Sequence, residues 1–284
     1  EVQAVDVNLF LDYCRRYKVD TGDTVYVYEN SNKSLARKKS SVSVLFKQLY
    51  RDELLDKNIT DGFDPIRVPR PGEREIKALQ DDEVMLMLDA VSAGSGLTER
   101  EHAYWEKTKK RDKAILILFL TYGLRLSELQ QLNISSFNFH RGEFIIYRKR
   151  GKESVMPLNQ SATAVLHDYI DNERDLISIS RDEDSDALFL SLQGRRMTER
   201  QIRELVKKYT AIALHTTKRA GYSPHKLRAT AATSLIGRGN SIFDVAALLD
   251  HEQVTTTQLY ARQKINVKRD LVKDMEWEEE RTDK

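Results

Sequence analysis

The residues that could do chemistry gather in the last third of the chain, between Gly221 and Arg262. His225 and Arg228 stand three positions apart, so they share one face if the segment is helical. His251 follows, and Tyr260 comes nine residues later. Each of these residue types is common in ordinary cores and surfaces. Their order, His-x-x-Arg, then His, then Tyr, is far more specific than any single member.

Local signals place these residues on three consecutive short helices. Ser223-Pro224 is typical of an N-cap followed by the first helical residue, because proline lacks the donor that would otherwise stay unpaired there. Gly237 and Gly239 predict the end of that helix. Ser241 predicts the cap of the next one, which leads toward His251.

Two further candidates lie upstream. Arg125 and Glu128 open a predicted helix three residues apart, and a buried arginine needs a carboxylate or phosphate partner. A plain structural ion pair would explain them equally well. Lys149 lies in a basic turn, RKRGK, between two predicted strands. Such a turn is either a solvated loop or a means of bringing a lysine to a phosphate.

Together these side chains fit phosphoryl transfer to a tyrosine. Two guanidinium groups can neutralise the charge that develops at phosphorus. A lysine can protonate the leaving 5′ oxygen, while a histidine assists removal of the phenol proton. A covalent phosphotyrosine would then conserve the energy of the broken bond. The candidate catalytic residues are Arg125, Lys149, His225, Arg228, His251 and Tyr260.

The amino-acid composition is typical of a globular protein. No metal or other cofactor is expected. Of 284 residues, 40% are hydrophobic and 32% charged. Ala114–Leu120, the longest apolar run, is too short to span a bilayer, and no signal peptide is visible, so a cytoplasmic protein is expected. Cys14 is the single cysteine, which excludes an internal disulfide or a multi-cysteine zinc site.

The net charge of +2 conceals a strongly basic segment. Between Arg195 and Arg228 there are ten lysines and arginines against two acids, whereas the tail from Asp274 onward is acidic. Basic residues beside His225 and Arg228 favour a polyanionic partner. A solvated helix face is the alternative for the basic run alone.

The expected fold class is α+β, mainly α with a small antiparallel sheet, in two domains. Residues 1–62 are predicted to form an all-helical bundle, with helices at 5–17 and 34–51 and a short third helix near 54–59. Glu1 is not a start residue, so the natural chain is expected to begin earlier. Residues 63–73 hold three of the five prolines and predict a linker.

The second predicted domain spans residues 74–284. Helices are expected at 81–91, 109–122 and 161–177, with a basic helix that begins after Thr198 and ends near Leu214. Residues 94–110 are expected to be a polar connection. Three strands are predicted at 136–139, 143–147 and 154–158, the last two joined by the basic turn. An apolar stripe predicts a final helix at 265–277.

The sequence resembles the tyrosine recombinases, the integrase family, and within them the Xer recombinases. The matching segments are TYGLRLSEL, YRKRGKESVMPL, SPHKLRATAAT and LLDHEQVTTTQLYAR, in the family's order and spacing. The resemblance covers residues 74–265. TKKRDKAILILFL and DSDALFLSLQGRRM are closest to the single-recombinase, XerS-like Xer type.

This resemblance implies a role for each candidate. Tyr260 would form a 3′-phosphotyrosyl bond, and Arg125, held by Glu128, would bind the phosphate with Arg228. His225 would act as base or phosphate contact, with His251 as a phosphate donor. Lys149 would be the general acid, although three consecutive basic residues replace the family's glycine-rich turn and make Lys152 a rival. Expected DNA contacts are Lys38, Lys39, Arg148, Arg150, Lys152, Arg200, Arg203 and Lys226.

The implied partners are a double-stranded DNA site and further copies of the chain, as a dimer on one site and a cyclic tetramer in the synapse. Resolution of chromosome dimers through a Holliday junction is the expected function, with a role in chromosome partition at cell division. A transposon or phage integrase and a plasmid resolvase are the nearest alternatives. A type IB topoisomerase and a non-catalytic DNA-binding protein are further ones. Any accessory protein is unknown.

Overall fold

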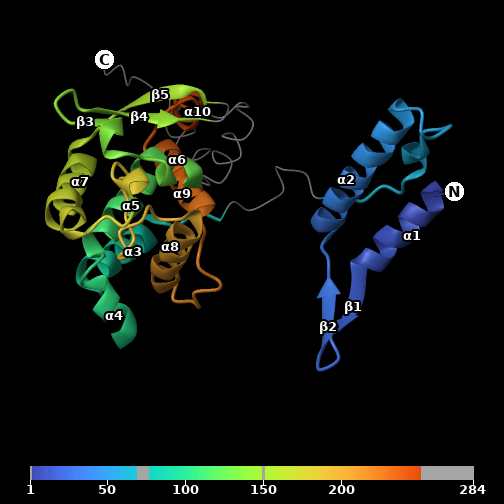
Figure 1. Cartoon of the computed structure of the whole chain (residues 1–284), viewed down its shortest axis with the longest axis horizontal. Coiled ribbons are helices and arrows are strands. Elements are labelled where there is room, and N and C mark those ends of the chain that lie inside the picture. Colours follow the sequence, from blue (N-terminus) through green and yellow to red (C-terminus); the bar gives the residue numbers. More distant parts are fainter. Residues whose placement is uncertain (1, 69–76, 149–150, 251–284) are drawn as a thin grey trace, which may run out of the picture. The chain divides into compact units, whose positions relative to one another are not determined.

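A computed structural model describes residues 2–68, 77–148 and 151–250 (Figure 1). The chain divides into two compact units, Glu1–Arg74 and Glu75–Lys284. Within the described ranges, the helices are too short or too polar to cross a membrane.

Unit 1 contains helices α1 (Ala4–Arg15) and α2 (Asn32–Arg51) and a 3₁₀ turn, η1 (Ile59–Gly62). Its small core joins Val7 and Leu11 of α1 to Ile59 and Phe63. The Ser31 hydroxyl accepts from the Ser34 amide and so caps α2. Burying one face of each helix against η1 holds this unit together.

The prediction of an all-helical unit 1 is wrong at residues 16–29. Strands β1 (Arg16–Asp20) and β2 (Val25–Glu29) pair antiparallel there, with Tyr17 opposite Tyr28. The two rings stack with centroids 5.1 Å apart. Valine and tyrosine favour strands, and Gly22 supplies the positive φ of the turn. Both strands are largely exposed, so they lack the inward and outward alternation that would have revealed them.

The predicted third helix near residues 54–59 is also wrong, since only η1 forms there. Asn58 accepts from the Thr60 amide and starts this 3₁₀ turn, and Glu53 has a positive φ of 58° just after α2. A non-glycine residue in that conformation ends a helix instead of continuing it.

Unit 2 is built around helix α5 (Lys109–Tyr122), as predicted. Its apolar residues from Ala114 to Phe119 lie in the main core, where α5 packs on α3 (Asp81–Ala93), α7 (Gln160–Asn172) and α9 (Pro224–Gly237). Gly123 then takes a φ of 57°, and a Cβ there would lie 2.5 Å from the Leu249 side chain. Glycine is therefore required to end α5 at this close approach.

The remaining elements of unit 2 follow the α+β pattern. They are α4 (Glu99–Trp105), α6 (Leu126–Gln130), η3 (Ile134–Ser136), β3 (Phe137–Asn138), β4 (Glu143–Tyr147), β5 (Glu153–Pro157), η5 (Arg174–Leu176), η6 (Asp182–Asp184), α8 (Glu199–Ala213) and α10 (Ile242–Leu249). The sheet order is β3-β4-β5, all antiparallel. Figure 1 shows the strands together at one end of the unit and α4 at the opposite end. The α+β prediction is confirmed.

Residues 94–110 differ from the predicted polar connection because they contain α4. Thr98 and Glu101 form a reciprocal capping box at its start. Trp105 is 5% exposed and donates from its indole nitrogen to the Val91 carbonyl at 2.8 Å. One buried aromatic residue thus anchors a helix that is otherwise polar.

Candidate active site

Arg125 lies between α5 and α6 and is fixed by a carboxylate one turn ahead. Glu128, 4% exposed, accepts from the Arg125 amide at 2.7 Å and from its Nη1 at 2.6 Å. The same carboxylate therefore caps α6 and orients the guanidinium. The 34% exposure of the Arg125 side chain leaves part of the guanidinium open to a ligand.

Arg228 reaches the same place from α9. The helix begins at Pro224 as predicted, although the Ser223 hydroxyl makes no capping hydrogen bond and its carbonyl accepts from the Lys226 amide instead. Arg228 is 3% exposed, donates to the Gly123 carbonyl at 2.6 Å and also donates to the Leu249 carbonyl. It thereby joins the ends of α5, α9 and α10.

A cavity of about 490 Å³ opens beside these residues and is here called the site cavity. It is lined by Leu124, Arg125, Leu126, Ser127, Glu199, Arg203, Ser223, Pro224, His225 and Arg228. Three of the six predicted catalytic residues, Arg125, His225 and Arg228, are thus brought together from segments a hundred residues apart. Two guanidinium groups and an imidazole suit an anionic ligand with several oxygen atoms.

The surroundings of His225 favour the neutral form of its imidazole. Partial burial lowers its pKa below the usual 6.5, and the positive charges of Lys226 and Arg228 lower it further. At neutral pH the ring therefore has a free nitrogen that can accept a proton or a hydrogen bond.

The turn between β4 and β5 approaches the site through its two ends. Lys152, at the far end of the turn, lies 3.5 Å from an Asp250 oxygen through its Nζ. Asp250 in turn lies 3.7 Å from Arg125 Nη1 through its other oxygen. The rival lysine is therefore linked to the site through one carboxylate. Lys149 and Arg150, at the tip, lie outside the described residues.

Arg148 does not fit the predicted DNA contact. Its side chain is 1% exposed, lies 3.5 Å from Glu128 and donates to the Leu248 carbonyl at 2.9 Å. Phe144 and Ile146 of β4 are buried, and residue 148 continues that alternation onto the inner face. This period of two could have predicted the burial of Arg148. We name Arg125, Arg148, Arg228 and Glu128 the arginine cluster.

Other predicted DNA contacts lie in varied surroundings. Arg200 is exposed near the start of α8, and Arg203 on the same helix pairs with Glu199 at 3.7 Å. Lys226 is partly buried on α9. In unit 1, Lys39 donates to the carbonyls of residues 63 and 64, which engages part of its ammonium group, and Lys38 is partly exposed.

Three of the six predicted catalytic residues, Lys149, His251 and Tyr260, lie outside the described residues. The helix predicted at 265–277 lies outside them too. The last described residue is Asp250, which ends α10 in the left-handed conformation with a φ of 50°. Its carbonyl accepts from Arg125 Nη2 at 3.0 Å. The end of α10 is therefore attached to the arginine cluster.

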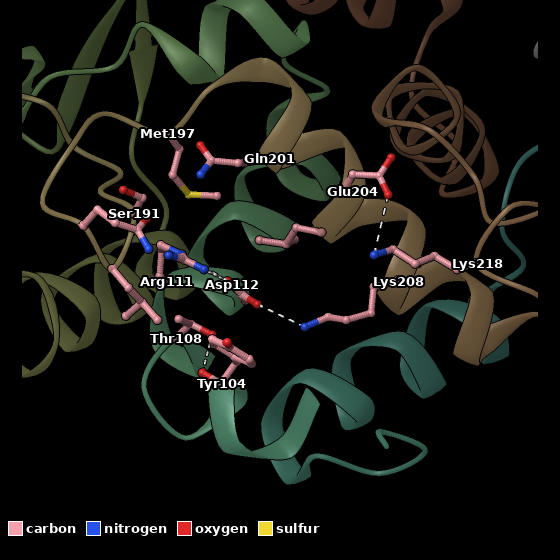
Figure 2. A pocket seen from close by; sticks show the side chains of 13 residues that line it. Tyr104, Thr108, Arg111, Asp112, Ser191, Met197, Gln201, Glu204, Lys208 and Lys218 are labelled. Atoms are coloured by element: carbon pink, nitrogen blue, oxygen red, sulfur yellow. Dashed lines mark hydrogen bonds and ion pairs between the residues drawn. The ribbon is translucent and has the colours of Figure 1, made fainter. Parts of the chain in front are cut away.

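A second polar cavity, of about 310 Å³, has a different character (Figure 2). There Asp112 accepts from Arg111 Nε and Nη2 at 3.1 and 2.8 Å and from the Tyr209 hydroxyl at 3.0 Å. Lys208 Nζ lies 3.5 Å away, and burial lowers the pKa of this lysine. Burial and the nearby Asp112 raise the pKa of Tyr209, so the phenol stays protonated. We name these four residues the Asp112 network.

Comparison with known proteins shows the family to which the chain belongs. Residues 77–266 match the phage integrase family. A tyrosine recombinase XerC of Alcanivorax borkumensis is 33% identical over 230 residues, 81% of this chain and 69% of the relative. A tyrosine recombinase XerC of Natranaerobius thermophilus is 34% identical over 236 residues, 82% of this chain and 72% of the relative.

Solved structures share the fold. A XerH site-specific recombinase bound to palindromic difH substrate gives a TM-score of 0.70 at 18% identity, covering 98% of this chain and 73% of that one. The Tn1549 transposon integrase in complex with circular intermediate DNA gives 0.62 at 21% identity, covering 96% and 85%. The chain belongs to the phage integrase family. It is an enzyme of the tyrosine recombinase class, a DNA strand-transferase.

Proposed function

We propose that this protein cleaves and rejoins DNA at a specific site through a covalent bond to Tyr260. The observation that carries the proposal is the convergence of Arg125, His225 and Arg228 on one cavity. These three side chains supply the positive charge and the neutral imidazole that attack on a phosphodiester needs. Membership in the phage integrase family supports the same reaction.

In the proposed step, the Tyr260 oxygen bonds to phosphorus while the bond from phosphorus to the 5′ oxygen breaks. The leaving oxygen takes a proton from Lys149, or from its rival Lys152, and the product carries a free 5′-hydroxyl. His225 accepts the phenol proton directly or holds a phosphate oxygen, and His251 donates to another oxygen. Attack by the 5′-hydroxyl of a second strand reverses the step and releases Tyr260.

Arg125 and Arg228 would bind the non-bridging oxygens of the phosphate. Both guanidinium groups donate to backbone carbonyls in the described structure. A phosphate oxygen carries negative charge, so it attracts a guanidinium more strongly than a neutral carbonyl does. Phosphate binding can therefore compete with these carbonyl contacts.

We assign a different role to each of the two domains. Residues 74–284 would form the catalytic domain, joined by the linker at 63–73 to a DNA-binding domain at 1–62. In this proposal both domains contact the DNA, with Lys38, Arg200 and Arg203 among the phosphate contacts. The helix predicted at 265–277 would dock on a neighbouring copy and so link the active sites of a cyclic tetramer. Packing of this helix on its own domain is the alternative.

Resolution of chromosome dimers is the biological role that we favour. The curated relatives named tyrosine recombinase XerC support it. The likeness to a Tn1549 transposon integrase keeps transposon or phage integration as the second candidate. Either role would place the protein on DNA in the cytoplasm. The genomic surroundings of the coding region distinguish the two roles.

Covalent trapping tests the proposed reaction. Duplexes with a nick beside the cleavage position lose the short 5′-hydroxyl fragment, so the protein stays attached. Such duplexes can be selected from a random-sequence pool by covalent capture with the wild-type protein and then used for all variants. We expect an adduct with wild type and none with Tyr260→Phe. An adduct that persists in Tyr260→Phe would show that another residue is the nucleophile.

A further inference from the structure

Three consecutive carbonyls at the end of α10 each accept from a different arginine. Arg148 donates to Leu248 at 2.9 Å, Arg228 donates to Leu249, and Arg125 donates to residue 250 at 3.0 Å. The last carbonyls of a helix lack partners within the helix and carry its negative partial charge, which favours cations. The end of α10 is thus held by all three arginines of the cluster.

Arg148 is almost fully enclosed. Its Nη1 lies 3.5 Å from both Glu128 oxygens, and its side chain is 1% exposed. The same carboxylate orients Arg125 at 2.6 Å. Arg148 does not line the site cavity, but it contacts Glu128, the carboxylate that orients Arg125. Arg148 therefore acts on Arg125 through Glu128.

The main chain of Arg148 also closes the basic turn. Its amide donates to the Lys152 carbonyl at 2.7 Å, and its carbonyl accepts from the Gly151 amide at 3.1 Å. Across the turn, the Lys152 ammonium lies 3.5 Å from Asp250. Both ends of the turn are thus attached to the end of α10, one through a buried arginine and the other through a surface ion pair.

We propose that Arg148 is a positioning residue, which holds the base of the lysine-bearing turn against Glu128 and the end of α10. The turn then presents its lysine to the same phosphate that Arg125 and Arg228 bind. Arg148 makes no contact with DNA in this proposal. The inference rests on the proposed strand cleavage and adds a residue that the phosphate-binding set does not include.

A purely structural role would give a different pattern of effects. Arg174 offers the matched comparison, because as a whole residue it is 5% exposed against 4% for Arg148. It donates to the carbonyls of Ala187 and Ser185 at 3.0 and 2.7 Å. It lies outside the arginine cluster and the site cavity. Replacement of either arginine by methionine keeps much of the side-chain volume and removes the buried donors.

The test compares wild type, Arg148→Met, Arg148→Lys and Arg174→Met as full chains on a duplex selected by covalent capture with wild type. Single-turnover cleavage is measured on that duplex and on one whose scissile 5′ oxygen is replaced by sulfur. A thiol ionises near pKa 8.5, so the sulfur leaves without a general acid. DNA affinity and urea unfolding are measured in parallel, so that binding and stability are separated from the chemical step.

We expect Arg148→Met to cleave the oxygen substrate roughly 100-fold more slowly than wild type, because a displaced acid loses its alignment. On the sulfur substrate its rate returns to within about threefold of wild type, since no proton is needed there. Arg174→Met cleaves both substrates at the wild-type rate. Arg148→Lys keeps the charge but cannot bridge Glu128 and Leu248 together, so it shows the same selective defect.

Equal slowing of Arg148→Met on both substrates, or no slowing on either, overturns the inference. Should Arg148→Met fail to fold, Arg148→Lys decides by the same comparison of substrates. Absence of any adduct with wild type would instead refute the proposed strand cleavage. The two failures are therefore distinguishable.

Discussion

Two buried ionic groups in unit 2 differ in how their charges are satisfied. In the Asp112 network, one carboxylate accepts from Arg111 and Tyr209 and lies 3.5 Å from Lys208 Nζ. Each cation of this network is therefore paired with a buried anion, although Arg111 Nη1 also donates to the Leu190 carbonyl. The arginine cluster has a single buried carboxylate, Glu128, shared by two of its three guanidinium groups. Each of the three guanidinium groups also donates to a backbone carbonyl.

The difference separates a structural group from one that can bind a ligand. A carboxylate holds its donors strongly, so the Asp112 network has little to offer an incoming anion. Neutral carbonyls hold guanidinium groups less strongly, and a phosphate can replace them. We therefore expect substitutions in the Asp112 network to change stability, whereas substitutions in the arginine cluster change catalysis.

Arg228→Lys is expected to have the largest effect. Lysine keeps the charge but cannot bridge two acceptors in a plane, so the developing charge at phosphorus loses a donor. The single-turnover cleavage rate should fall roughly 100- to 1,000-fold, measured on the selected nicked duplex. Arg174→Lys is the control and should cleave at the wild-type rate. If Arg174→Lys lost a comparable part of its cleavage rate, the loss in Arg228→Lys could come from disturbing any buried arginine and would not mark the arginine cluster as catalytic.

His225→Gln tests the protonation state of the site. A base works in its neutral form, and the pKa of His225 is lowered below 6.5. In wild type, the cleavage rate should therefore be constant at neutral pH and fall as the pH drops through that lowered pKa. His225→Gln should lose this acidic limb and cleave roughly 100-fold more slowly at pH 7. If the pH profiles of wild type and His225→Gln had the same shape, His225 would contact the phosphate without accepting the phenol proton.

Tyr209→Phe addresses the Asp112 network. The substitution removes the hydroxyl that donates to Asp112 at 3.0 Å and leaves the aromatic ring in the core. The free energy of unfolding should fall by about 1–3 kcal/mol, because one buried oxygen of Asp112 loses a partner. Urea unfolding measures this loss. The cleavage rate per folded molecule should stay unchanged, and a large fall in that rate would link the network to catalysis.

Glu173→Gln probes the N-terminal end of α5. Glu173 accepts from the Lys110 amide at 2.8 Å, and burial raises its pKa from 4.5 to about 7. The folded protein therefore binds this proton more tightly than the unfolded chain, so stability falls as the pH rises from about 4.5 to about 7. Glu173→Gln should flatten this dependence in unfolding experiments across that range. An unchanged slope would mean that Glu173 does not titrate there.

Arg203→Ala should have the smallest effect on the fold. Its exposed pair with Glu199 contributes at most a few tenths of a kcal/mol. If Arg203 contacts a DNA phosphate, the salt dependence of binding should weaken by about one unit of slope. Affinity measured at several salt concentrations tests this expectation. Arg181→Ala removes another exposed ion pair and serves as the control.

Much of unit 2 could be predicted because its signals are local. Pro224 and Gly123 mark helix ends, and the pair of residues at 125 and 128 follows from helical spacing alone. The convergence of three arginines on the end of α10 depends on packing between distant segments, which no local pattern encodes. A charged residue beside a turn is usually exposed, which favours a surface position for Arg148, whereas the alternation along β4 favours the inner face that it occupies.

The attachment site of the covalent intermediate tests the central claim most directly. The adduct of wild-type protein with the selected nicked duplex is digested with trypsin and nuclease, and the modified peptide is sequenced by mass spectrometry. We predict a single phosphotyrosyl link at Tyr260, formed at full yield by wild type and strongly reduced in Arg228→Lys. A link to any other residue, or a yield unaffected by Arg228→Lys, would contradict the assignment of the arginine cluster to catalysis.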